Sequence, residues 1–302
     1  AIARLYGVGS SIFFACALFL VKRCRTDALS ALWIRGIGTL FLSAIQIISS
    51  KETVYPGKGL LNLVVWRSVV TGLSIACAFL AVRLLKMTIW AIICRFQTIS
   101  FLIASILFFG YKFDIRVVFA AAVSFFGATL VMAPSIYGFT PRPGESLQLS
   151  RTPSEILGLF IGFSWLLIDL VAFILLVKMA GQVSAALANY WLNIALSLTA
   201  GFMIVAKDGL FTFNLDEMHY YIGYNVFYFI ALTLLFESTK LEKNMGIQAV
   251  LSCFFLITSL FLEIIFLNAS VTLPNLAGCI LVVASSIWAV SIRTQSNPEQ
   301  QK

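Results

Sequence analysis

The fold is decided by the stretch from Arg83 to Pro134, RLLKMTIWAIICRFQTISFLIASILFFGYKFDIRVVFAAAVSFFGATLVMAP. It holds two apolar segments of roughly 20 residues, each long enough to cross a bilayer, joined by a short turn at 110–114. The pattern returns about 157 residues later, between Ser238 and Ser286, as STKLEKNMGIQAVLSCFFLITSLFLEIIFLNASVTLPNLAGCILVVASS. The chain therefore shows an internal duplication, with the same sequence pattern in each half.

The composition is that of a membrane protein. Hydrophobic residues make up 60% and charged residues 11% of the 302 positions, whereas soluble domains carry about 25% charged residues. A large water-soluble domain is therefore excluded. Ten apolar runs predict ten spans, over residues 3–21, 29–49, 61–82, 88–109, 115–133, 155–177, 184–206, 219–236, 246–267 and 273–292.

The longest break between spans, rich in proline and glycine, separates the two halves. We expect a first five-helix repeat over 1–137, a linker over 138–153 and a second five-helix repeat over 154–302. With five spans in each half, the second half enters the bilayer from the opposite side. The predicted fold is thus an all-α membrane protein of ten transmembrane helices in two inverted five-helix repeats, an architecture typical of secondary transporters.

Local signals place several helix ends. Asp27 is suited to cap the second span, and Thr152, Pro153 and Glu155 form a capping box at the start of the sixth. No proline lies in the interior of a span, so we expect few sharp kinks.

The charge distribution and the spacing of the cysteines limit the classes of partner that we expect for this chain. The net charge of +8 comes from basic residues at span ends, where they meet lipid headgroups, and does not indicate nucleic-acid binding. The six cysteines and the single histidine, His219, show no metal-ligand spacing, so we expect no metal, no cofactor and no enzymatic activity. The expected partners are the lipid bilayer and a small-molecule substrate, and a homodimer is left open. Both termini are expected in the cytosol, and the plasma membrane and an endomembrane both remain as locations.

Ionisable side chains inside spans are costly unless paired or hydrated, which makes them candidate functional residues. There are five: Arg35, Arg67, Arg95, Asp169 and Glu263. The alternatives for the arginines are snorkelling or a buried ion pair. The carboxylate in the sixth span lies near the midplane, where it would neutralise an arginine, carry a proton or contact substrate. The glutamate lies near a span end and is expected at the interface.

Polar stripes at helical spacing mark faces that should turn inward, because lipid offers no hydrogen-bond partners. The alternative is that these residues only join helices. The stripes are Arg67, Thr71 and Ser74 in the third span, Cys94, Gln97, Thr98, Phe101 and Ser105 in the fourth, and Asn189, Asn193 and Ser197 in the seventh. Three stripes in different spans favour a shared polar cavity.

Tyrosines at the start of the eighth span have two interpretations. Tyr220, Tyr224 and Tyr228 follow one another at spacings of four. They form either an interfacial aromatic belt or, near Tyr224 and Tyr228, an aromatic wall of the cavity.

These features together resemble the EamA type of the drug/metabolite transporter superfamily, over nearly the whole chain. The segment Val64–Phe113 is most similar to the G branch of solute carrier family 35, through Arg67 at the start of the third span and the pair Lys112-Phe113 in the turn that ends the span-4/span-5 hairpin. The chain departs from the family at Tyr111, where a glutamate is usual. The resemblance implies transport of a small polar metabolite by alternating access, without ATP hydrolysis.

Charge inside the spans points to the class of substrate. Three in-span arginines against one deep carboxylate favour an anionic or zwitterionic metabolite, such as a carboxylate or an amino acid. The triose-phosphate and nucleotide-sugar branches, which resemble this fold too, have basic substrate-binding residues in the ninth span. Phosphorylated sugars rank lower here, because 245–267 contains no lysine or arginine. The candidate substrate-binding residues are Arg35, Arg67, Thr71, Arg95, Gln97, Asp169, Asn189, Asn193, Tyr224 and Tyr228. The alternative function is a non-transporting membrane subunit or regulator that retains the transporter fold.

Overall fold

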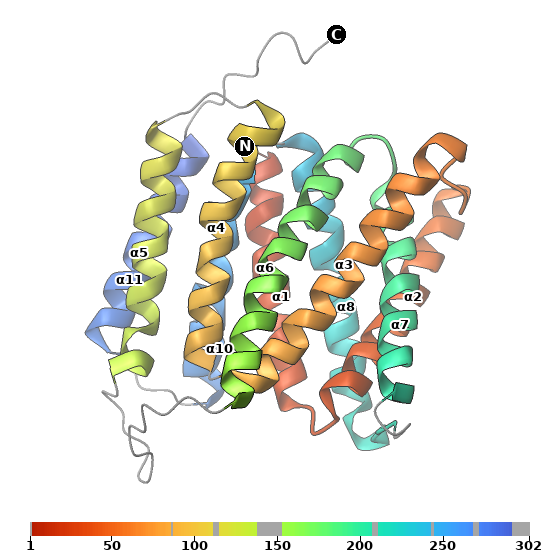
Figure 1. Cartoon of the computed structure of the whole chain (residues 1–302), viewed down its shortest axis with the longest axis horizontal. Helices are drawn as coiled ribbons and strands as arrows, with labels where there is room; N and C mark the ends of the chain where they lie inside the picture. The colour runs from red at the N-terminus through yellow and green to blue at the C-terminus, as the bar shows by residue number, and fades with distance from the viewer. Residues whose placement is uncertain are drawn as a thin grey trace.

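The computed structural model describes residues 2–85, 87–110, 115–137, 153–206, 211–242, 245–267 and 272–291. Every regular element in these ranges is a helix, and the helices run up and down one bundle (Figure 1). They are α1 (Ile2–Arg23), α2 (Ala28–Ser50), α3 (Lys58–Leu84), α4 (Met87–Phe109), α5 (Ile115–Tyr137), α6 (Pro153–Met179), α7 (Ala185–Ala206), the 3-10 turn η1 (Leu215–Glu217), α8 (Met218–Leu241), α9 (Met245–Ser252), α10 (Phe254–Leu267) and α11 (Leu273–Ser291).

The surface of the bundle is apolar and suited to lipid. Six helices are long and apolar enough to cross a membrane: α1, α2, α3, α6, α7 and α8. Shorter apolar stretches lie at Ile99–Phe109, Ile115–Val131, Val250–Phe266 and Leu273–Ala289. Large side chains such as Phe202 and Leu273 are 76% and 83% exposed, whereas many serines and asparagines are buried. Because a water-soluble protein has the opposite distribution, the chain is a multi-pass helical membrane protein.

Helices from the two halves of the chain pack against one another. The most extensive contacts join α1 to α8, α3 to α6, α2 to α7 and α5 to α11. The α5–α11 pair lies at one edge of the bundle and the α2–α7 pair at the other (Figure 1). The two halves therefore interleave, and the core lies between them.

Two helix starts follow the predicted signals. The Asp27 carboxylate caps α2 by accepting a hydrogen bond from the Leu29 backbone N–H at 3.1 Å, which satisfies one of the free donors of the first turn. Pro153 is the first residue of α6, where a missing N–H costs nothing. Thr152, which we expected to cap this helix, lies outside the described residues.

The ninth predicted span, 246–267, contains a break that the sequence did not signal. The ninth span divides at Cys253 into α9 and α10, without a proline. The Cys253 N–H donates to Val250 O and the Leu256 N–H to Cys253 O, both at 3.1 Å, so tight three-residue turns replace the α-helical pattern. The Ser11 hydroxyl of α1 contacts Leu251 O at 3.3 Å. A neighbouring side chain therefore supplies a partner beside the break.

The α5–α11 crossing depends on facing glycines. A Cβ built on Gly278 would lie 2.4 Å from Gly127 O and 2.6 Å from Val131 N. Because both atoms belong to the backbone, neither can turn aside.

We expect Gly278→Ala to push α5 and α11 apart and to lower the free energy of unfolding by about 1–3 kcal/mol, the usual cost of overpacking. The measurement is the thermal unfolding midpoint of the purified protein in detergent. The matched control is Gly59→Ala, because a Cβ on Gly59 meets nothing within 4 Å. Equal midpoints for the two variants would contradict this account of the crossing.

Candidate functional site

The guanidinium of Arg35 lies buried inside the bundle, on α2. The residue is 5% exposed, and its Cζ atom lies 3.8 Å from the centre of the Tyr228 ring. In the described part of the chain, Arg35 makes no hydrogen bond to a protein acceptor and no ion pair, and its Nε atom is buried without a partner. A cation stacked on an aromatic face is stabilised, but the N–H donors of this guanidinium remain available.

The tyrosines of α8 line this region from the opposite helix. Tyr221, Tyr224 and Tyr228 are all buried and pack with Ala17 of α1. The Tyr224 hydroxyl donates to Ala31 O of α2 at 3.3 Å. These three rings therefore lie within the bundle, between α1 and α2, and do not form a lipid-facing belt.

The polar stripe of α7 also turns inward. Asn189 and Asn193 are 1% and 0% exposed. The Thr39 hydroxyl of α2 donates to Asn193 Oδ1 at 2.8 Å, and Asn189 Nδ2 donates to the Thr233 hydroxyl of α8 at 3.3 Å. Each asparagine thus joins two helices, as the alternative interpretation of the stripe requires. Each also keeps one buried atom without a partner, namely Asn189 Oδ1 and Asn193 Nδ2.

Asn225 belongs to this region and was missed by the sequence analysis. It is 7% exposed, its Nδ2 donates to Tyr221 O at 2.7 Å, and its Oδ1 has no partner. A Cβ on Gly38 of α2 would lie 2.5 Å from this amide, so the glycine makes room for it. The available signal was an asparagine inside an apolar span.

Arg67 enters the core from α3. It is 4% exposed, and its Nη1 donates to Ala188 O of α7 at 3.1 Å. Its Nε is buried without a partner. Thr71, predicted to share its role, is partly buried and uses its hydroxyl to bond back to Arg67 O at 2.7 Å.

The buried atoms that lack a hydrogen-bond partner gather in this region. Among the described residues there are eight such atoms, and six of them lie on α2, α3, α7 and α8. Apart from Gln46 Oε1, they are Arg35 Nε, Arg67 Nε, Asn189 Oδ1, Asn193 Nδ2 and Asn225 Oδ1. An unpaired buried polar atom costs about 1–3 kcal/mol, so water or a polar ligand is needed to satisfy the group. We refer to these five residues with Tyr224 and Tyr228 as the Arg35 region.

Asp169 lies in a different cluster, between α3, α4 and α6. It accepts hydrogen bonds from the Ser74 hydroxyl at 2.8 Å and from Gln97 Nε2. Among the described residues no basic side chain contacts it, so the predicted pairing with an arginine is not seen with Arg35 or Arg67 and stays a prediction for Arg95. The structure therefore brings Gln97 and Asp169 together, apart from Arg35.

Two of the predicted in-span charges cannot be placed. The backbones of Arg95 and Glu263 lie in α4 and α10, and their side chains are outside the described residues. Their expected roles remain predictions. Within the described ranges, no group of three or more histidine, cysteine, aspartate or glutamate residues could hold a metal ion.

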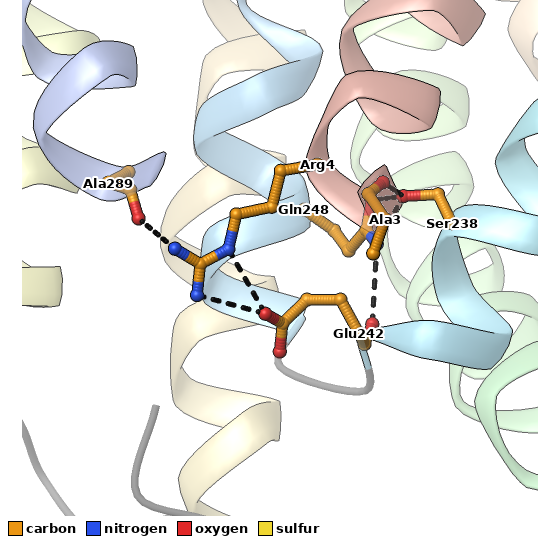
Figure 2. Close-up of polar contacts among 6 residues, drawn as sticks. All are labelled: Ala3, Arg4, Ser238, Glu242, Gln248 and Ala289. Carbon is orange, nitrogen blue, oxygen red and sulfur yellow. Dashed lines mark hydrogen bonds and ion pairs between the residues drawn. The ribbon is translucent and has the colours of Figure 1, made fainter. Parts of the chain in front are cut away.

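An ion pair that the sequence analysis missed ties α1 to the end of α8 (Figure 2). The Arg4 guanidinium donates from Nε and Nη2 to Glu242 Oε2, at 3.2 and 3.1 Å, and from Nη1 to Ala289 O of α11 at 3.0 Å. Beside it, Gln248 Nε2 of α9 contacts the Ser238 hydroxyl at 2.7 Å. Four helices therefore meet at this end of the bundle.

A second polar cluster joins α1 to α8 at the other end. The Glu217 carboxylate accepts from the Arg25 N–H at 3.0 Å and from the Thr26 hydroxyl at 3.1 Å. The Tyr221 hydroxyl also contacts Glu217, at 3.4 Å. Burial, with the nearby Glu217 charge, raises the pKa of the Cys24 thiol to about 11, so this cysteine stays protonated at neutral pH. Polar contacts therefore join α1 to α8 at both ends of the pair. Arg35 and Tyr228 lie between these two polar clusters.

Comparison with known proteins supports the fold and no more. No family model and no curated protein matches the chain. A protein of known crystal structure has the same fold, with a TM-score of 0.78 over 95% of this chain and 96% of that chain. At 12% sequence identity, this likeness carries no information about activity.

Proposed function

We propose that the chain is a secondary transporter for a small anionic or zwitterionic metabolite, a carboxylate or an amino acid, which binds in the Arg35 region. The observation that carries the proposal is the buried Arg35 guanidinium, which rests on Tyr228 and has no protein acceptor in the described part of the chain. An anion that accepts from the free N–H groups would supply the missing countercharge. Nearby amide atoms of Asn193 and Asn225 offer one donor and one acceptor for the rest of the molecule.

Helix contacts support the two inverted repeats that such a transporter would use. If each helix in the first half corresponds to the helix five spans later, the α1–α8 contact is the counterpart of α3–α6. The same correspondence exchanges α2 with α7 and α5 with α11, so each of these two contacts is its own counterpart. All four contacts are present. The break between α9 and α10 is also the kind of discontinuity found in transporter spans. Rocking one repeat against the other would give alternating access.

The competing function is a membrane subunit or regulator that keeps the fold but carries nothing. It requires the in-span charges to be paired with one another or with helix ends. Arg67 partly meets this requirement, since it donates to Ala188 O. Arg35 has no such partner among the described residues, and this difference favours the transporter.

Ligand-induced stabilisation separates the two functions. Purified protein in detergent is heated with succinate, glutamate, alanine or glucose 6-phosphate, and the unfolding midpoint is recorded. A ligand at a hundred times its dissociation constant stabilises the folded state by about 2.7 kcal/mol. We expect succinate or glutamate to raise the midpoint and glucose 6-phosphate to raise it less. If no compound in the panel raises it, the proposed substrate class is wrong.

A further inference from the structure

Asp169 lies deep in the apolar part of α6. It is about 24 Å along the helix from Pro153 and about 15 Å from Met179, at 1.5 Å per residue. On this helix Leu167 and Val171 are 66% and 48% exposed and mark the lipid-facing side. Two residues correspond to a rotation of about 200°, so Asp169 lies on the opposite face, where it remains partly exposed. An ionised carboxylate at this depth is costly unless a partner or water compensates it.

The partners of Asp169 are neutral. Ser74 Oγ donates to Oδ1 and Gln97 Nε2 donates to Oδ2. Glu242 offers the contrast, because it is held by the guanidinium of Arg4. A basic partner keeps a carboxylate ionised, whereas Asp169 has no such constraint from the described residues.

The same two partners suit both protonation states. A serine hydroxyl can donate or accept, and a glutamine amide presents a donor on one side and an acceptor on the other. When Oδ2 carries a proton, a rotated Gln97 amide accepts it through Oε1, while Ser74 still donates to Oδ1. The cluster therefore stays fully hydrogen-bonded whether the carboxyl is neutral or ionised.

Among the described side chains, no other ionisable group on the helices packed against α6 replaces these partners. Cys77 of α3 and Cys94 of α4 pack with the cluster that contains Trp165, one turn from Asp169. Arg67 lies about 10 Å along α3 from Ser74 and donates to α7. On α8, the phenols of Tyr224 and Tyr228 face α1 and α2, and Glu237 pairs with Lys240 at 3.8 Å. On α4, Arg95 is the remaining basic residue, and its side chain is outside the described residues.

We propose that Asp169 is a reversible proton-binding site of the transport cycle, separate from the Arg35 region. A proton from solvent on one side of the membrane forms an O–H bond at Oδ2, and the same bond breaks when the proton leaves to the other side. The step adds one positive charge to the loaded carrier and offsets one negative charge of the bound anion. This inference rests on the proposed transport function.

Infrared difference spectroscopy tests the proton site without any substrate. Purified protein in lipid nanodiscs is titrated from alkaline to acidic pH, and the C=O stretching band of protonated carboxyl groups is followed. We expect one band that grows during the titration in the wild type, is absent from Asp169→Asn, and persists in the matched variant Glu237→Gln. Asn is nearly isosteric with Asp, and an unchanged size-exclusion profile confirms that the variant folds. If wild type and Asp169→Asn give the same bands at every pH, the proposal is overturned.

A second readout separates this proposal from the proposed function. The unfolding midpoint with succinate or glutamate is measured on the same samples. A titrating Asp169 band without any ligand-induced stabilisation supports the proton site and contradicts the transporter. Ligand-induced stabilisation that depends on Arg35, without a titrating band, overturns the proton site and leaves the transporter intact.

Discussion

Replacing Arg35 by glutamine is expected to weaken anion binding about 10- to 150-fold. A hydrogen bond to a charged group contributes about 1.5–3 kcal/mol, and 1.4 kcal/mol corresponds to a factor of ten in affinity. Arg35 is a buried cation with unused donors that an incoming carboxylate would meet. The measurement is the concentration of succinate or glutamate needed for half-maximal stabilisation of the purified protein.

Two further variants make this prediction specific. Arg35→Lys keeps the charge but loses the planar group that lies on the Tyr228 ring, so an intermediate affinity is expected. Arg25→Gln is the matched control, because the Arg25 side chain is exposed in the α1–α2 turn and hydrogen-bonds there through its backbone. If Arg35→Gln binds succinate or glutamate with wild-type affinity, the substrate site does not lie in the Arg35 region.

Replacing Glu242 by alanine is expected to produce the largest loss of stability, about 3–5 kcal/mol. Removal of one partner from a buried ion pair leaves the other charge without compensation. The side chains of Arg4 and Glu242 are only 9% and 11% exposed. The measurement is the free energy of unfolding in detergent, from the thermal or denaturant midpoint.

The matched control for Glu242 lies on the same helix. Glu237 pairs with Lys240 at 3.8 Å, with side chains 34% and 44% exposed, so Glu237→Ala should cost about 0–1 kcal/mol. Replacing Arg4 and Glu242 together by Met and Leu should restore most of the stability, because an apolar pair of similar volume avoids the desolvation cost. Equal losses for Glu242→Ala and Glu237→Ala would show that the Arg4 ion pair contributes nothing.

Features that depend on local chemistry were predictable from the sequence. The cap at Asp27 and the start of α6 at Pro153 need only the geometry of a helix terminus. The burial of Arg35, Arg67 and the α7 asparagines follows from the cost of polar groups in lipid. The roles of these residues in substrate binding remain predictions.

Features that depend on the register between helices were not predictable. Arg4 and Glu242 lie 238 positions apart at the ends of their helices. Charged residues are common at helix ends, so nothing in the sequence indicates that these two form an ion pair. The fit of Asn225 against Gly38 requires knowledge of how α2 crosses α8. The break at Cys253 involves a contact from Ser11 of another helix, so no local signal such as proline announces it.

The most direct test of the central claim is the uptake of radiolabelled succinate and glutamate by proteoliposomes. We predict time-dependent uptake of at least one of them with the wild-type protein, loss of that uptake with Arg35→Gln, and wild-type uptake with Arg25→Gln. Liposomes without protein set the background. Background-level flux of both compounds with folded wild-type protein, or equal uptake by wild type and Arg35→Gln, would contradict the account.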